Sequence, residues 1–152
     1  APLQPVAGDL RFVLSVMRIN SSLERIGDLT KSIAKRSLSL FKHPMPLPDG
    51  LTLMADTTCS MLQACVKSFA GEDVEQARRV RQSDQIVDDL QKEVISWAQE
   101  SITGQVDTAT AAIDIMSIAR KLERIADLAT NIAEDVIFLA EGSLVRHTSS
   151  KQ

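Results

Sequence analysis

Aromatic residues are scarce in this chain. Its 152 residues include four Phe, one Trp and no Tyr, so aromatics make up 3% of the sequence while hydrophobic residues make up 44%. A hydrophobic core must therefore be aliphatic, which suits packed helices. A chain of this length buries about two thirds of the surface that it would expose when unfolded, which is enough for one core. A single domain is expected, and a second independent domain is not.

Other absences exclude classes of function. The net charge is -3 and the basic residues are interleaved with acidic ones, which argues against a nucleic-acid surface because phosphate contacts need clustered Lys and Arg. No apolar run approaches the roughly 20 residues that cross a bilayer. The first ten residues, APLQPVAGDL, lack the charged and apolar regions of a signal peptide. A soluble cytoplasmic protein is expected.

Cysteine is nearly absent too. Cys59 and Cys65 are six residues apart within one expected helix, which places them on opposite sides of it and too far apart for a disulfide. Both are expected to be small, buried, apolar residues.

Gly and Pro are few, and their positions divide the chain. Nearly all of the eleven lie in residues 2–8, in residues 44–50, or as single glycines at 71, 104 and 142. Between these breaks the sequence predicts helices over about 8–41, 51–70, 74–102 and 107–141. Short connections make consecutive helices antiparallel. The expected fold is all-α, an antiparallel bundle of four long helices.

Several residues are expected to mark the helix ends. Asp9 and Asp73 are expected N-caps of the first and third helices, and Asp107 or Thr108 of the fourth. Gly71 and Gly142 are expected just beyond the ends of the second and fourth helices, with a frayed polar tail after Gly142.

Three of these helices carry apolar residues at helical spacing, which predicts the faces that pack together. In the first helix they are Ile19, Leu23, Ile26, Leu29, Ile33 and Leu40. In the third they are Val80, Val87, Leu90, Val94 and Trp97, and in the last Leu122, Ile125, Leu128, Ile132 and Leu139.

One segment occurs twice. Residues 23–40, LERIGDLTKSIAKRSLSL, align at an offset of 99 with residues 122–139, LERIADLATNIAEDVIFL, and nine of the eighteen positions are identical. Each copy places a Glu and an Asp four residues apart, Glu24 with Asp28 and Glu123 with Asp127. Like charges at this spacing repel on a helix by a few tenths of a kcal/mol, so helix stability does not explain the repeated pair.

The third helix carries another such pair, Asp84 and Asp88. If the third and fourth helices are antiparallel neighbours, this pair meets Glu123 and Asp127 across the groove between them. Converging carboxylates raise each other's pKa, and a bound multivalent cation removes the repulsion. The alternative is that these acids are merely solvated.

Other chemistry finds little support. His43 lies in the Pro-rich connection and His147 in the tail, so neither suits the Glu-x-x-His motif of a di-iron bundle. The glycines are isolated and form no phosphate loop, and no serine has the surroundings of a nucleophile elbow. An enzyme is not expected.

Several segments of the chain are distinctive. They are QPVAGDLR at residues 4–11, the LERIGD and LERIAD motifs, and RKLERIADLATNIAEDVIFLAEG at residues 120–142. These segments resemble the PhoU family of bacterial phosphate-signalling proteins. The resemblance implies tandem three-helix bundles whose acidic motifs bind multinuclear metal clusters. It implies one metal site at Asp84, Asp88, Glu123 and Asp127, with Asn131 a weaker candidate, and another at Glu24 and Asp28. The metal is unspecified among Fe, Ni, Zn, Mn and Mg.

The resemblance also implies a function. Such a protein is a negative regulator of the phosphate-starvation response that couples a phosphate-specific ABC transporter to a sensor histidine kinase, and it reaches the membrane only through these partners. Two alternatives stay open. One is a carboxylate-bridged metal bundle with a storage or enzymatic role, and the other is a purely structural helical module.

One departure from the family bears on assembly. The resemblance implies two further helices before QPVAGDLR, so residues 8–41 represent only the last helix of a first repeat, and residues 51–142 a complete second repeat, within one domain over 1–152. A fragment, a naturally short form, or a bundle completed by another copy are the three explanations. An exposed apolar stripe on the first helix favours an oligomer, most simply a two-fold dimer.

Overall fold

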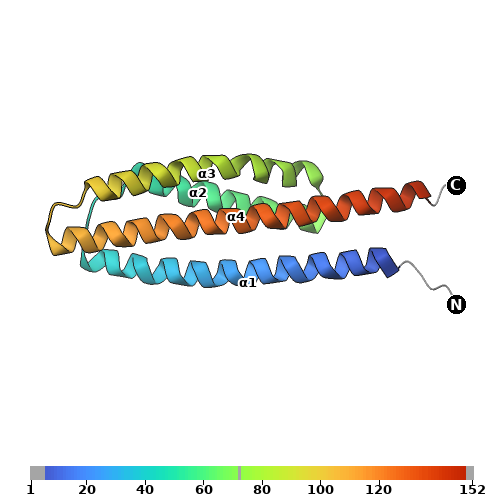
Figure 1. Ribbon diagram of the computed structural model, residues 1–152, viewed down its shortest axis with the longest axis horizontal. Coiled ribbons are helices and arrows are strands. Elements are labelled where there is room, and N and C mark those ends of the chain that lie inside the picture. The colour runs from blue at the N-terminus through green and yellow to red at the C-terminus, as the bar shows by residue number, and fades with distance from the viewer. Residues whose placement is uncertain (1–5, 72, 150–152) are drawn as a thin grey trace.

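A computed structural model describes residues 6–71 and 73–149 of the chain, and of residues 143–149 the backbone only. Four helices are present in this part: α1 (Val6–Lys42), α2 (Asp49–Gly71), α3 (Val74–Glu100) and α4 (Val106–Ser149). Consecutive helices run antiparallel, as Figure 1 shows, and α1 is also antiparallel to α4. The predicted all-α antiparallel bundle is confirmed. α2, α3 and α4 form a three-helix bundle, whereas α1 packs against α4 alone.

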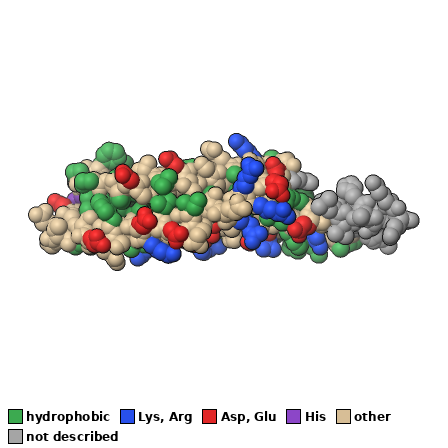
Figure 2. Space-filling view, turned by 90° about the horizontal axis from the view of Figure 1, so that it is seen from above, with side chains coloured by type: hydrophobic (Ala, Val, Ile, Leu, Met, Phe, Trp, Pro, Cys, Tyr) green, Lys and Arg blue, Asp and Glu red, His purple; other side chains and the backbone are tan. Residues whose placement is uncertain are grey.

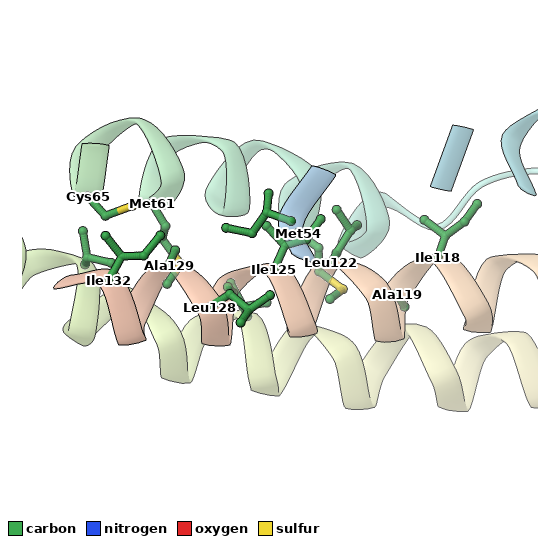
Figure 3. Close-up of a cluster of buried hydrophobic side chains, with 14 of the residues drawn as sticks. Met54, Met61, Cys65, Ile118, Ala119, Leu122, Ile125, Leu128, Ala129 and Ile132 are labelled. Atoms are coloured by element: carbon green, nitrogen blue, oxygen red, sulfur yellow. The ribbon is translucent and has the colours of Figure 1, made fainter. Parts of the chain in front are cut away.

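α4 is the central helix because it contacts each of the other three. Alanines make this possible, since a small side chain lets a neighbouring helix approach closely. Fully buried alanines recur along α4 at positions 112, 119, 126, 129 and 133. Figure 3 shows Met54, Met61 and Cys65 of α2 lying against Ile125 and Ile132 of α4. Each side chain of the size of Ile or Met, fully buried here, contributes about 1.5–3 kcal/mol.

The seam of α3 agrees with its prediction. Val80, Val87 and Val94, seven residues apart, are at most 1% exposed, and Leu90 and Trp97 pack beside them. Asp73 is the predicted N-cap, and its carboxylate accepts a hydrogen bond of 3.0 Å from the backbone N–H of Gln76.

The seam of α1 is narrower than predicted. Ile19 and Ile26 are buried against α4, and Leu29, Ile33 and Leu40 are partly buried there. The expectation for Leu23 was wrong, because it is 40% exposed: it lies at the edge of a stripe that repeats every seven residues and meets only one neighbouring helix. On the rest of α1 many large apolar side chains are exposed, namely Val6, Leu10, Phe12, Val13, Leu14, Met17, Leu38 and Phe41.

Among the described side chains, two ion pairs join α1 to α4. Arg36 donates a hydrogen bond of 2.9 Å to Asp114, and Arg18 lies 3.4 Å from Asp135. Both carboxylates are buried, with side-chain exposures of 2% for Asp114 and 7% for Asp135. A buried carboxylate is costly without a partner, so each arginine ties the otherwise thinly packed α1 to the bundle.

Several predicted helix ends were wrong. α1 begins at Val6, before Asp9, and α4 begins at Val106, which leaves Asp107 inside the first turn. Asp107 is instead hydrogen-bonded at 2.9 Å to the ring of His43, and so links the Pro-rich connection to α4. α3 ends at Glu100, two residues early, and Gly104 in the next connection takes the left-handed conformation with a φ of 84°.

Two glycines that were expected just beyond helix ends lie within helices. Gly71 is the last residue of α2, and α4 continues through Gly142 to Ser149, so the expected stop and frayed tail were wrong for this stretch. A glycine inside a helix costs only about 1 kcal/mol relative to alanine. Arg11 of α1, which stacks 4.4 Å from the ring centre of Phe138, lies where a Cβ at Gly142 would be. His147 falls within α4, but its side chain lies outside the described residues.

The two cysteines are both free, but only one is buried. Cys65 lies in the core, where burial raises the pKa of its thiol to about 11. Cys59 is exposed, so the expectation that both are buried was wrong. Among the described helices, none has the length and hydropathy that crossing a bilayer requires.

Candidate metal centre

Three aspartates meet in the groove between α3 and α4. One carboxylate oxygen each of Asp84, Asp88 and Asp127 lies within 4.8 Å of the others, and all three residues are half-buried. The core positions them: Asp84 and Asp88 flank the buried Val87, and Asp127 lies between the buried Ala126 and Leu128.

Glu123 completes this acidic group, one turn before Asp127 on α4. Burial raises the pKa of Glu123 to about 7, assisted by a hydrogen bond with Asp127 and by the charges of Asp127, Asp88 and Asp84. The acidic pairs of the two helices therefore share one electrostatic environment, and a proton occupies Glu123 part of the time near neutral pH.

Within this acidic group, Asp84 has a buried carboxylate oxygen and several charged neighbours. Burial raises the pKa of Asp84, as do the charges of Asp127, Asp88 and Glu134, while the hydroxyl of Thr130 acts in the opposite direction. The Oδ1 atom of Asp84 is fully buried, and neither it nor the buried Oγ1 of the nearby Thr130 meets hydrogen-bond geometry with a partner among the described residues. A buried carboxylate oxygen without a partner is unfavourable, and a cation would supply the missing interaction.

Asp89 provides a contrast on the same helix. It is exposed and accepts hydrogen bonds from Lys92 at 3.1 Å and Gln85 at 3.0 Å, and these interactions lower its pKa. Asp89 thus behaves as an ordinary solvated acid, whereas its neighbour Asp88 faces the other carboxylates.

The residues present fit a hard cation. The group offers carboxylate oxygens only, which suits Mg, Mn and other cations that accept oxygen ligands. Arg124 lies 4.0 Å from Asp127 and balances part of the negative charge. The negative charge of the four carboxylates is larger than Arg124, which is exposed, can neutralise. A bound multivalent cation would therefore relieve the repulsion between them.

Comparison with known proteins agrees with this architecture. The model of the PhoU domain matches residues 1–37 and 51–136. The chain belongs to the PhoU family. It is 34% identical over 138 residues to the phosphate-specific transport system accessory protein PhoU homolog 1 of Methanothermobacter thermautotrophicus, covering 90% of this chain and 63% of that protein. It is 36% identical over 144 residues to the PhoU homolog of Xylella fastidiosa strain 9a5c, covering 91% of this chain and 59% of that protein.

A solved structure of the family has the same fold. PhoU from Pseudomonas aeruginosa superimposes with a TM-score of 0.83 at 32% identity, over 93% of this chain and 68% of that one. The chain spans about three fifths of the length of the curated relatives named here. The second matched segment contains the acidic residues of α3 and α4, and the first contains the acidic pair of α1.

The remaining candidates from the sequence lie elsewhere in this PhoU-family fold. Glu24 and Asp28 are exposed on α1, and no group of three or more possible metal ligands among the described residues includes them. Asn131 is exposed too, and it faces the groove between α1 and α4, in a hollow of about 300 Å³ shared with Arg18 and Asp135. The structure therefore brings together the acids of α3 and α4 and leaves Glu24 and Asp28 outside that group.

Two neighbours of the centre were not singled out from the sequence. Thr130 lies beside Asp84, and Arg81 lies 3.7 Å from Glu134, whose charge acts on Asp84. Their spacing in the sequence could have identified them. Thr130 follows Asp127 by three residues and Arg81 precedes Asp84 by three, so each lies within one helical turn of an acidic residue.

Proposed function

We propose that this chain regulates phosphate uptake as a metal-binding adaptor rather than as an enzyme. Relatives of this chain are named phosphate-specific transport system accessory proteins, including one from Serratia marcescens that is 32% identical over an alignment covering 97% of this chain. An accessory protein works by association, so the partner is a phosphate ABC transporter at the cytoplasmic face of the membrane. In the finer form of the proposal, a sensor histidine kinase is the second partner and the outcome is repression of the starvation response.

The buried, unpartnered Oδ1 of Asp84 within the acidic group is the observation that carries the metal part of this proposal. Asp84, Asp88, Asp127 and Glu123 would hold the metal, and a cluster of more than one ion suits four carboxylates. Glu24 and Asp28 would bind metal only if another protein surface brought further metal ligands to α1.

Metal analysis of protein purified without chelator tests the assignment. We expect bound Fe, Mn, Ni, Zn or Mg in the wild type and its loss in Glu123→Ala/Asp127→Ala. The repeated segment offers a matched control, because Glu24→Ala/Asp28→Ala removes the same two residue types from α1. Equal metal content in the wild type and the α4 variant would exclude this site.

The same carboxylate group favours one alternative, a metal store or enzyme. Neither His nor Cys belongs to the acidic group found among the described residues, which suits oxygen-ligand chemistry better than soft-metal chemistry. Many ions per chain would favour storage, and turnover by the metal-loaded wild type that the α4 variant lacks would favour an enzyme.

We also propose that the outer face of α1 pairs with a second copy of this chain. Met17, Glu24, Lys31 and Leu38 are spaced seven apart on it, and all four are exposed. In an antiparallel pair centred between residues 27 and 28, Met17 of one copy meets Leu38 of the other, and Glu24 meets Lys31. Light scattering is expected to show a dimer that Met17→Lys dissociates, and a wild-type monomer over a wide concentration range would exclude this pairing.

A further inference from the structure

A basic hollow lies on α3 near its beginning. It has a volume of about 400 Å³ and is lined by Arg78, Arg81 and Gln82. All three side chains carry N–H donors, and among the described residues no carboxylate lines the hollow. Figure 2 shows Lys and Arg side chains gathered toward this end of the molecule, next to Asp and Glu side chains. Such a hollow suits a small anion.

Arg81 connects the hollow to the acidic group. It lies three residues before Asp84, within one turn of the same helix, and its Nε is 3.7 Å from Glu134 of α4. Glu134 is close enough to Asp84 for its charge to act on it. Arg81, which lines the hollow, is therefore followed within one turn of α3 by Asp84 of the candidate metal centre.

We propose that this hollow binds inorganic phosphate when the neighbouring carboxylates hold a metal ion, an inference that rests on the metal site proposed above. Guanidinium groups bind phosphate oxygens through paired, charge-assisted hydrogen bonds, and Arg78 and Arg81 would supply these. Gln82 would donate one more from its amide. Phosphate oxygens are also good ligands for hard cations, so an anion at this edge can meet both the arginines and the metal.

The existing partners of the two arginines do not block the hollow. Arg78 is 3.0 Å from Glu75, and Arg81 pairs with Glu134. The side chains of Arg78 and Arg81 are 55% and 53% exposed. Exposed pairs of this kind contribute only about 0–1 kcal/mol, so phosphate competes with them easily. They do hold the guanidinium groups near the hollow before an anion arrives.

The metal and the anion should strengthen each other's binding. Without metal, the carboxylates of Asp84, Asp88 and Asp127 repel an anion at Arg81, and a bound multivalent cation reverses this field. Coupling between two sites is reciprocal and commonly amounts to a factor of about 5–150. We expect phosphate to bind about tenfold more tightly to the metal-loaded protein, and the metal to bind more tightly by the same factor when phosphate is bound.

Calorimetric titration of sodium phosphate into the protein tests this, with manganese-loaded and chelator-treated samples of known metal content. Phosphate affinity is expected to fall at least about tenfold in Arg78→Ala/Arg81→Ala, which removes both guanidinium groups. Arg79→Ala is the matched control, because Arg79 is an exposed arginine on the same helix that does not line the hollow. Sulfate, a weaker ligand for hard cations, is expected to bind less tightly than phosphate.

The possible outcomes separate the two proposals. Metal in the wild type without any phosphate binding would overturn the phosphate site and leave the metal centre standing. Equal phosphate affinity in the wild type and the double variant would also overturn it, as would sulfate binding as tight as that of phosphate. Phosphate binding of equal strength with and without manganese would overturn the coupling to the metal.

Discussion

Replacing Asp127 by Asn should stabilise the protein in the absence of metal. Asp127 is the principal charge raising the pKa of Asp84, and it contributes to the raised pKa of Glu123 through both a hydrogen bond and its charge. Asparagine keeps the size and the hydrogen-bonding capacity of the side chain but removes this charge. The folded state then loses a repulsion that is weaker in the unfolded chain, where the two helices are apart.

The geometry sets the size of the effect. Two unit charges 4.8 Å apart repel by about 0.9 kcal/mol at the dielectric constant of water. Asp84 and Asp88 both lie within this distance of Asp127, so the repulsion removed is about 2 kcal/mol before screening. Salt and the loss of the exposed Arg124 pair reduce the gain to about 1 kcal/mol.

Urea unfolding followed by circular dichroism measures this gain, in chelator, at low salt and at a pH well above the pKa of Glu123. Asp89→Asn is the control, because Asp89 is stabilised by Lys92 and Gln85 and its loss is expected to destabilise slightly. Manganese should then stabilise the wild type more than Asp127→Asn, since binding to the folded state alone adds to stability. If Asp127→Asn were as destabilising as Asp89→Asn, the three aspartates would not form a repulsive group and would not need a cation.

Three further outcomes follow from the structure. The pKa of Glu123 is raised from 4.5 to about 7 on folding, so between these values the folded state holds a proton that the unfolded chain has lost. Stability of the metal-free protein therefore falls as pH rises through this window, by about 1 kcal/mol after allowance for exposure, and urea titrations should show a weaker pH dependence in Glu123→Gln. Arg36→Ala should destabilise by about 3 kcal/mol because it leaves Asp114 buried and unpaired, and adding Asp114→Asn to this variant should recover part of the loss in the same measurement. A thiol reagent should label Cys59 in the folded protein but Cys65 only after unfolding, as mass spectrometry would show, because Cys65 is buried and its thiol has a pKa of about 11.

The sequence was sufficient for the features that depend on local pattern. The heptad spacing of Val80, Val87 and Val94 predicted the buried face of α3, and Asp73 was recognisable as an N-cap from its place before that helix. The neighbouring positions of Asp84 and Asp127 followed from antiparallel helices with a short connection. These features need only periodicity, helix direction and connection length.

Features that depend on contacts between distant residues were not predictable in the same way. Asp114 and Asp135 are buried in α4 and pair there with Arg36 and Arg18 of α1. Their spacing of 21 residues, three heptads, was a usable signal that they share one face. No such signal indicated that α4 continues through Gly142. At this glycine, the side chain of Arg11, from the opposite end of the sequence, occupies the space of a Cβ atom.

The two copies of the repeated segment show that an acidic pair does not by itself make a site. In α4, Glu123 and Asp127 lie against α3, where burial and nearby aspartates raise the pKa of Glu123 and two aspartates of α3 face Asp127. In α1, Glu24 and Asp28 have the same spacing but remain exposed, because α1 packs on α4 alone in the part of the chain that the structure describes. The difference therefore comes from the neighbouring helix and the burial that it provides. Metal affinity in this fold is expected to be a property of a helix pair, and it would appear at α1 only if another helix brought carboxylates to its outer face.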